Sequence, residues 1–320
     1  MKMNIHHSQG QNARPPTIKI LTNMKTIHYL LLSIILPVTC LVSATQAEPA
    51  LSVQLLTTFD YPGATSTTPL GINELGDVAG YFVDASGATR GFVRFRNGRF
   101  SAPIVEPNDG TSTQGQGINT SRVTCGFYLN PADGLHHGYF RTGNTFTEFN
   151  VTGATETLVF GSLTDAGDFV GSFSDVPFGA LQGYINVGGT TTVVNVPGAS
   201  GTEPLGLNSA HESVGLYFDP SGLHGFFRDA AGVLTYPWDI PGATFTELVD
   251  LNDSGRIVGA YGDSAGLTHG VLMTSTGTFI PFDYPGQTVT ALTAINNAGL
   301  ICGLYIDSAG ASHGFTARSR

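Results

Sequence analysis

The chain has 320 residues, of which 12% are charged, and its formal net charge at pH 7 is −10 with histidine neutral. After residue 47 there are ten arginines, no lysine and 24 acidic residues, a net charge of −14. Nucleic-acid phosphates and anionic membranes both require basic surfaces, so this composition argues against either as a partner. It favours cations or uncharged ligands such as glycans.

Residues 1–47 have the pattern of an over-extended start followed by a signal peptide. From Met24, the expected natural start, a basic segment containing Lys25 precedes an apolar stretch at 29–42 and small residues at 43–47. The alternative is a membrane anchor, for which this stretch is short. We expect cleavage near residues 44–48, no membrane insertion afterwards, and a secreted protein that is extracellular or periplasmic.

Six copies of one repeat, which we number one to six, occupy residues 51–320. Their clearest marker is a column of asparagines: Asn73, Asn119, Asn208, Asn252 and Asn296. Thr164 takes the place of asparagine in repeat three, and the six positions are spaced by 46, 45, 44, 44 and 44 residues. A fixed period of this size indicates a repeat architecture. The asparagine precedes a glycine three residues later in several copies, which is turn chemistry.

Each copy contains four short strand-like runs separated by turn residues. In repeat four the runs are 203–207, 213–218, 224–228 and 233–240, and no helical periodicity competes with them. Four strands in about 45 residues is the size of one propeller blade. We therefore predict an all-β, six-bladed propeller with blades at roughly 65–106, 111–151, 155–196, 200–240, 244–284 and 288–317 plus 52–61.

The two ends of the repeat region predict ring closure. Repeat six stops after its third strand, and 52–61 matches the missing fourth strand. An N-terminal strand completing the last blade would remove an exposed edge. The alternatives are a β-solenoid and a pair of β-sandwiches. We expect a monomer.

The repeated phrase resembles the bacterial extracellular repeats of the HAF type. The shared features are a Gly-Ile-Asn start, as at 71–73, and a His-Gly-Phe variant of the family triplet at 224–226 and 313–315. The resemblance covers nearly all of residues 59–315. It implies an exported repeat protein, and it supplies no catalytic residues that can be carried over to this chain.

Two further columns have a structural interpretation. An Asp column faces a mostly His column across a hairpin turn, as Asp307 faces His313. Six such pairs could hold a metal or move protons, but Arg90 and Gln182 in the His column fit a hydrogen bond that pins the hairpin. Cys125 and Cys302 stand where sister repeats carry Val or Ala, so we expect buried thiols and no disulfide.

Positions where the copies disagree are better candidates for function. Glu203 and Glu247 share a column in adjacent repeats, near the start of the innermost strand. They are candidates to bind a ligand or a cation, and Ca²⁺ is the candidate cofactor. Alternatively, they could act as an acid–base pair. The alternative is two solvated glutamates at a rim. His211 is the only histidine in its turn column and is expected at the surface.

Repeat one contains a cluster of four arginines within ten residues: Arg90, Arg94, Arg96 and Arg99. They form a candidate patch for an acidic partner or acidic glycan. The alternative is a solvated outer strand that discourages edge pairing.

Two functional hypotheses follow. The first is an exported, non-enzymatic propeller that binds a glycan, a cell-surface component or a protein partner. The second is a hydrolase or lyase centred on the channel, with or without a divalent cation. Since the chain has none of the common zinc, serine-nucleophile or phosphate-binding motifs, the sequence leaves open whether the protein is an enzyme, and no metal site is assigned.

Overall fold

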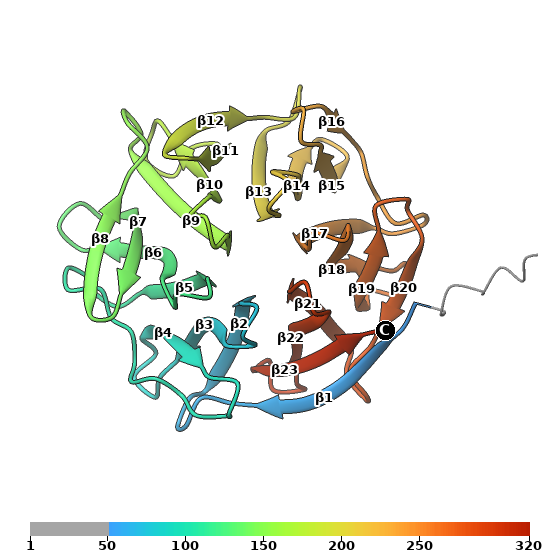
Figure 1. Cartoon of the computed structure of the whole chain (residues 1–320), viewed down its shortest axis with the longest axis horizontal. Coiled ribbons are helices and arrows are strands. Elements are labelled where there is room, and N and C mark those ends of the chain that lie inside the picture. The colour runs from blue at the N-terminus through green and yellow to red at the C-terminus, as the bar shows by residue number, and fades with distance from the viewer. Residues whose placement is uncertain (1–50) are drawn as a thin grey trace, which may run out of the picture. The chain divides into compact units, whose positions relative to one another are not determined.

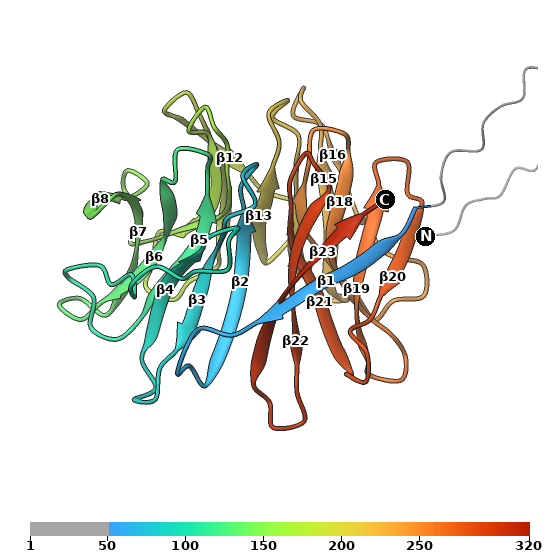
Figure 2. The ribbon, with the colours of Figure 1, turned by 60° about the horizontal axis from the view of Figure 1, so that its bottom comes forward.

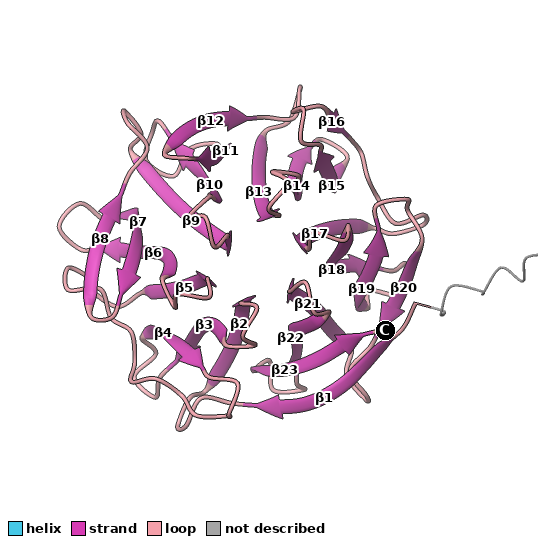
Figure 3. Ribbon diagram, viewed as in Figure 1, coloured by secondary structure: helices cyan, strands magenta, loops and turns pink. Residues whose placement is uncertain are grey.

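The computed structural model describes residues 51–320, and the expected leader at 1–47 lies outside the described residues. The described chain is all-β, with strands joined by turns and no helix (Figure 3). The strands of repeats one to three are β2 (Ser66–Ile72), β3 (Val78–Val83), β4 (Thr89–Arg94), β5 (Thr113–Ile118), β6 (Thr124–Asn130), β7 (Leu135–Thr142), β8 (Thr145–Phe149), β9 (Glu156–Leu163), β10 (Phe169–Ser174), β11 (Gln182–Val187) and β12 (Thr190–Val194).

The strands of repeats four to six are β13 (Gly201–Leu207), β14 (Ser213–Asp219), β15 (Gly222–Arg228), β16 (Leu234–Thr235), β17 (Phe245–Leu251), β18 (Arg256–Gly262), β19 (Thr268–Thr274), β20 (Phe279–Phe282), β21 (Val289–Ile295), β22 (Leu300–Ile306) and β23 (Ser312–Ser319). The remaining strand, β1 (Val53–Phe59), precedes repeat one and pairs antiparallel with β23.

Each repeat forms an antiparallel sheet in which neighbours in the chain are neighbours in space. Repeats two, three and four form separate four-stranded sheets, and repeat one forms three strands plus isolated bridges at Phe100 and Ile104. The strands of repeats five and six, with β1, belong to one eight-stranded sheet. A single parallel pair, Thr268 with Val289, joins its two halves.

The sheets are arranged radially about a central axis, with β2, β5, β9, β13, β17 and β21 innermost (Figure 1). This is a β-propeller arrangement, as predicted. Figure 2 shows the strands from the side, with turns gathered at two ends. We call the end with the turns between first and second strands the mouth end. The end with the turns between second and third strands is the hairpin end.

Every innermost strand contains a β-bulge. The register shifts at the same place in all six repeats, for example between Leu248 and Asp250 in β17. The bulge brings a carbonyl against a glycine of the second strand, where a Cβ on Gly126 would overlap the Gln114 oxygen. Glycine is therefore required there, and the bulge re-aims the residue that follows it.

The core lies between adjacent sheets. Aromatic residues of the third strands are fully buried: Phe92, Tyr139, Tyr184, Phe226 and Phe315. Cys125 and Cys302 are buried free thiols, as expected of small apolar residues. Burial raises the pKa of both thiols to about 12, so they are inert as nucleophiles.

Candidate functional site

The asparagine column joins neighbouring repeats at the mouth end. The Asn73 oxygen accepts from the Asp77 amide within its own turn (2.8 Å), which is the predicted turn chemistry. Its side-chain amide also donates to the carbonyl of the next asparagine. These bonds run from Asn73 to Asn119 (3.0 Å), Asn208 to Asn252 (3.5 Å), Asn252 to Asn296 (3.1 Å) and Asn296 to Asn73 (2.9 Å). The last bond links repeat six directly to repeat one.

The residues that follow the asparagines form a second set of bonds between repeats. Each contact joins a backbone amide to a side chain of the next repeat: Thr120 to Asp165 (2.8 Å), Ser209 to Asp253 (2.9 Å), Asp253 to Asn297 (2.8 Å) and Asn297 to Glu74 (2.9 Å). These bonds hold three carboxylates at fixed positions around the axis, and hydrogen bonds to charged acceptors are the stronger kind.

These turns surround a cavity of about 170 Å³ that residues of all six repeats line. We call it the mouth cavity. Next to the cavity, the backbones of repeats one to three approach one another closely. A Cβ on Gly71 would lie only 2.7 Å from the Gln116 oxygen and 3.4 Å from the Gly161 oxygen. A water occupies roughly 10–15 Å³ of such a space, so the cavity has room for roughly a dozen water-sized groups. That is about the size of one sugar ring.

Asp250 and Ser162 meet in the mouth cavity from repeats five and three. The Ser162 hydroxyl donates to Asp250 Oδ1 at 2.7 Å, and the amides of Leu251 and Ile295 donate to the same carboxylate at 2.9 Å each. Burial raises the pKa of Asp250 to about 6, although these hydrogen bonds act in the opposite direction. Asp250 therefore changes charge near neutral pH.

The lining of the mouth cavity carries charge of one sign. It includes the carboxylates of Glu74, Asp165, Asp250 and Asp253 and no lysine, arginine or histidine. Acceptors thus outnumber donors, and the arrangement can bind hydroxyl or ammonium groups.

Sequence reasoning missed Asp250 and Ser162, but their column contained a signal. Two residues before the asparagine, the repeats carry Gly71, Gly117, Ser162, Gly206, Asp250 and Ala294. An aspartate among glycine, serine and alanine is the kind of disagreement between copies that indicates function.

The predicted pair Glu203 and Glu247 lies in β13 and β17, outside the mouth cavity. Both residues are partly buried. Burial raises the pKa of both carboxyls, and the Glu247 charge raises that of Glu203 further. The two charges therefore interact.

The arginine cluster divides between the two ends of the propeller. Arg90, at the start of β4, lies at the hairpin end and is paired with Asp109 (3.1 Å) and Asp84 (3.7 Å). Arg94, at the other end of the strand, places its guanidinium 4.5 Å from the centre of the Phe59 ring. Burial lowers the pKa of Arg94. Arg96 and Arg99 follow in the turn at the mouth end, so the four side chains do not form one surface.

The contacts predicted across the hairpins are present. They are His224–Asp219 (3.4 Å), His269–Asp263 (3.3 Å), His313–Asp307 (3.2 Å), Arg90–Asp84 (3.7 Å) and Gln182–Asp175 (2.8 Å). In repeat two, His137 pairs with Asp133 (2.9 Å) rather than with the column residue Asn130. In three of these histidines the other ring nitrogen, Nδ1, contacts a second acid that was not predicted. The pairs are His224–Asp239 (2.7 Å), His269–Asp283 (2.7 Å) and His313–Asp60 (3.0 Å).

His211 does more than occupy a surface turn. Its side chain is 42% exposed, and Nε2 lies 3.0 Å from Asp168 of the preceding repeat. Its φ of 63° is in the left-handed region. His211 therefore joins repeats three and four at the mouth end.

Among residues 51–320, no group of three or more His, Cys, Asp or Glu side chains has the arrangement of a metal site. The same range contains no helix that is long and apolar enough to cross a bilayer.

Fold and site together define a β-propeller with an acidic cavity at one end of its axis. No family model matches the chain, and no curated protein matches it.

Solved structures do match. The chain is similar to a protein provisionally described as a gluconolactonase (14% identity, 85% of this chain and 93% of that chain, TM-score 0.52). It is also similar to a prolyl endopeptidase (16%, 82% and 43%, TM-score 0.51) and to an arginine-substituted variant of AofleA from Arthrobotrys oligospora (11%, 83% and 86%, TM-score 0.50). At these identities the likeness shows the fold alone.

Proposed function

We propose that the protein is an exported, non-enzymatic propeller of six blades that binds the end of a glycan in the mouth cavity. The glycan belongs to a cell surface or to a glycosylated partner. The observation that carries the proposal is the 170 Å³ cavity that all six repeats line, with Asp250 and Ser162 inside it. Its acceptor-rich lining favours a sugar that presents hydroxyl and amino groups.

Six blades and ring closure are supported by contacts between the chain ends. β1 pairs with β23 from Val53↔Ser319 to Phe59↔Gly314, so it occupies the fourth-strand position of repeat six. The Asn296–Asn73 bond and the contact of Ser312 with Thr68 (2.8 Å) link repeat six to repeat one. Export is supported by the basic, apolar and small-residue order at 24–47, and the likeness to HAF repeats agrees with it.

Thermal shift with simple sugars tests the binding proposal. Residues 48–320 would be melted with glucosamine, N-acetylglucosamine and glucose at rising concentrations. A ligand at one hundred times its Kd stabilises the native state by about 2.7 kcal/mol, which is roughly 5–10 °C for a chain of this size. We expect glucosamine to give the largest shift.

Two variants locate the site. Asp250→Asn should abolish the shift, because it removes the carboxylate that meets Ser162 inside the cavity. Glu203→Gln, a matched change outside the cavity, should leave the shift intact. Equal shifts in all three proteins would refute the proposal. So would the absence of a shift with every sugar together with no binding on a broad glycan array.

A second candidate function is a channel-centred hydrolase or lyase. It is favoured by Asp250, because a carboxyl with a pKa of about 6 is suited to general acid catalysis near neutral pH. The interacting pair Glu203 and Glu247 is the other candidate, alone or with a divalent cation such as Ca²⁺. Release of reducing sugar from mixed glycans, lost in Asp250→Asn or Glu203→Gln, would support an enzyme. Unchanged glycans after prolonged incubation with and without Ca²⁺ would exclude one for those substrates.

A further inference from the structure

The hairpin loop of repeat three is apolar where the other repeats are polar. Sister turns have sequences such as Asp-Ser-Ala-Gly at 307–310, whereas residues 175–181 read Asp-Val-Pro-Phe-Gly-Ala-Leu. Phe178 is 74% exposed and Val176 is 57% exposed. Among the other hairpin turns of residues 51–320, one exposes a large apolar side chain, Leu267 in repeat five, which is 36% exposed. Apolar side chains that are exposed together, unlike single ones, are typical of interaction sites.

The backbone of Phe178 is held in a conformation that a non-glycine residue rarely adopts. Its φ is 53°, in the left-handed region. The Phe178 amide donates to Glu156 Oε2 at 2.7 Å. Strain of this kind persists only where surrounding contacts maintain it, and it gathers at functional sites.

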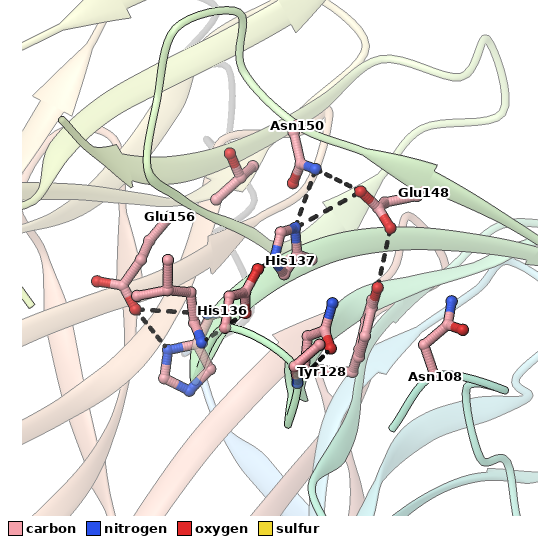
Figure 4. A network of polar contacts seen from close by, with 12 residues as sticks. Asn108, Tyr128, His136, His137, Glu148, Asn150 and Glu156 are labelled. Carbon is pink, nitrogen blue, oxygen red and sulfur yellow. Dashed lines mark hydrogen bonds and ion pairs between the residues drawn. The ribbon is translucent and has the colours of Figure 1, made fainter. Parts of the chain in front are cut away.

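Glu156 is a buried carboxylate that only repeat three possesses. It is 4% exposed, and its Oε1 lies 3.1 Å from His136 Nδ1 and 3.4 Å from the His136 amide (Figure 4). Sister repeats carry Ser66, Ser112, Gly201, Phe245 and Val289 at its position. A charged group buried in one repeat alone therefore fixes the loop that displays Phe178.

The apolar surface continues into repeat four. The Phe218 ring is 38% exposed. It lies 3.6 Å from the position of a Cβ on Gly201, and the Leu181 backbone lies 3.8 Å from the same position. The loop of repeat three and the hairpin of repeat four thus border one another.

Acidic side chains lie at the same hairpin end in repeat three and in the two repeats that flank it. They are Asp133 and Glu148 from repeat two, Asp175 from repeat three, and Asp219 and Asp239 from repeat four. Several are fixed by bonds, and Glu148 accepts from the Tyr128 hydroxyl (2.9 Å) and from Asn150 (2.6 Å), as Figure 4 shows. Within residues 51–320 there is no lysine, and Arg90 is the one arginine at the hairpin end by strand topology. It is paired with Asp109 and Asp84. The histidines at this end contact the same acids, His137 with Asp133 and His224 with Asp219 and Asp239.

We propose that the hairpin end of repeats two to four docks a basic polypeptide segment, with Phe178 and Val176 as its apolar anchors. Lysine or arginine side chains of the partner meet the acids at this end, and apolar side chains between them pack on the Phe178 ring. Opposite charges steer the encounter, and aromatic anchors are enriched among the few residues that dominate the binding free energy of interfaces. This site is at the opposite end of the propeller from the mouth cavity, and it does not depend on the proposed function.

The probes are three synthetic peptides of about twelve residues: alternating Lys and Leu, alternating Lys and Ser, and alternating Glu and Leu. Binding to residues 48–320 would be measured by fluorescence anisotropy at low and high salt. We expect the Lys–Leu peptide to bind at least about tenfold more tightly than the Lys–Ser peptide, and the Glu–Leu peptide not to bind. The affinity should fall as salt rises.

Three variants test whether Phe178 is the apolar anchor. Phe178→Ala should weaken Lys–Leu binding about tenfold or more with unchanged melting temperature, because its ring is exposed. Glu156→Gln should weaken Lys–Leu binding, because it alters the contact that holds the Phe178 backbone. Its melting temperature should confirm that the variant is folded. Leu75→Ala, a matched removal of a side chain that is 43% exposed at the mouth end, should have no effect. Equal affinity of Phe178→Ala and the unaltered protein, or equal affinity for both lysine peptides, would overturn the proposal.

Discussion

Replacing Asp250 by Asn should change the way stability depends on pH. The pKa of Asp250 is about 6 in the folded protein against 3.8 for an ordinary aspartate, and burial is the largest cause. The folded state therefore binds a proton at higher pH than the unfolded state does. Stability must fall as pH rises from about 4 to about 6, because the buried charge then forms.

The magnitude follows from the shift. A difference of roughly two pKa units corresponds to about 3 kcal/mol between the fully protonated and fully ionised limits. Asparagine cannot ionise, so Asp250→Asn lacks this pH dependence. Its amide can accept only some of the hydrogen bonds that Ser162, Leu251 and Ile295 donate to the carboxylate, a cost of about 1–3 kcal/mol at every pH.

Urea unfolding of both proteins at pH 4, 5, 6, 7 and 8 provides the assay. The other titrating groups cancel in the difference between the two proteins. We expect the free energy of unfolding of Asp250→Asn, relative to the unaltered chain, to rise by about 2.5 kcal/mol between pH 4 and pH 8, because part of the total change of about 3 kcal/mol lies below pH 4. Ser162→Ala should enlarge the pH dependence, because the serine hydrogen bond lowers the pKa of Asp250. A difference that is constant across this range would refute a buried, raised-pKa carboxyl in the mouth cavity.

Three further predictions concern contacts that hold the propeller together. Asn252→Ala should cost about 1–3 kcal/mol in urea unfolding, because Asn252 donates to Asn296 and accepts from the amides of Ser254 and Arg256; a cost no larger than that of the exposed Leu75→Ala would contradict it. Burial opposes protonation of His269, but Asp283 and Asp263 outweigh it and raise its pKa. The stabilisation by His269 is therefore full below the ordinary value of 6.5 and is lost as pH rises through the higher folded pKa. The stability difference between the unaltered chain and His269→Gln should shrink from pH 6 to pH 9, and an NMR titration of the ring should give a pKa above 6.5. Deletion of 51–59 should expose the edge of β23 and lower stability by several kcal/mol, with self-association in light scattering; a stable monomer would argue against closure by β1.

The repeat pattern was sufficient to predict the architecture because it specifies local structure six times over. Strand length, turn residues and the matching segment at 52–61 are all visible in the sequence. The asparagine column was correctly assigned to turns, but its bonds between repeats were not foreseen. A period gives the spacing of Asn296 and Asn73 along the chain, and only the arrangement of the sheets in space brings these two residues together.

The candidate site was harder to predict. Glu203 and Glu247 attracted attention because they are charged and adjacent in the alignment of repeats. Asp250 is three residues beyond Glu247, but the bulge in β17 lies between them. Since a bulge reverses the alternation of side chains, simple strand periodicity does not place Asp250 in the mouth cavity. Phe178 was obscured for a different reason, since repeat three departs from the consensus along its whole hairpin.

A crystal structure of residues 48–320 soaked with glucosamine tests the central claim most directly. The account predicts one sugar ring in the mouth cavity, with hydroxyl or amino groups within hydrogen-bond distance of Asp250 and Ser162. It also predicts that the ring is absent from crystals of Asp250→Asn grown in the same way. A sugar bound elsewhere, with the mouth cavity holding only water in both crystals, would contradict the account.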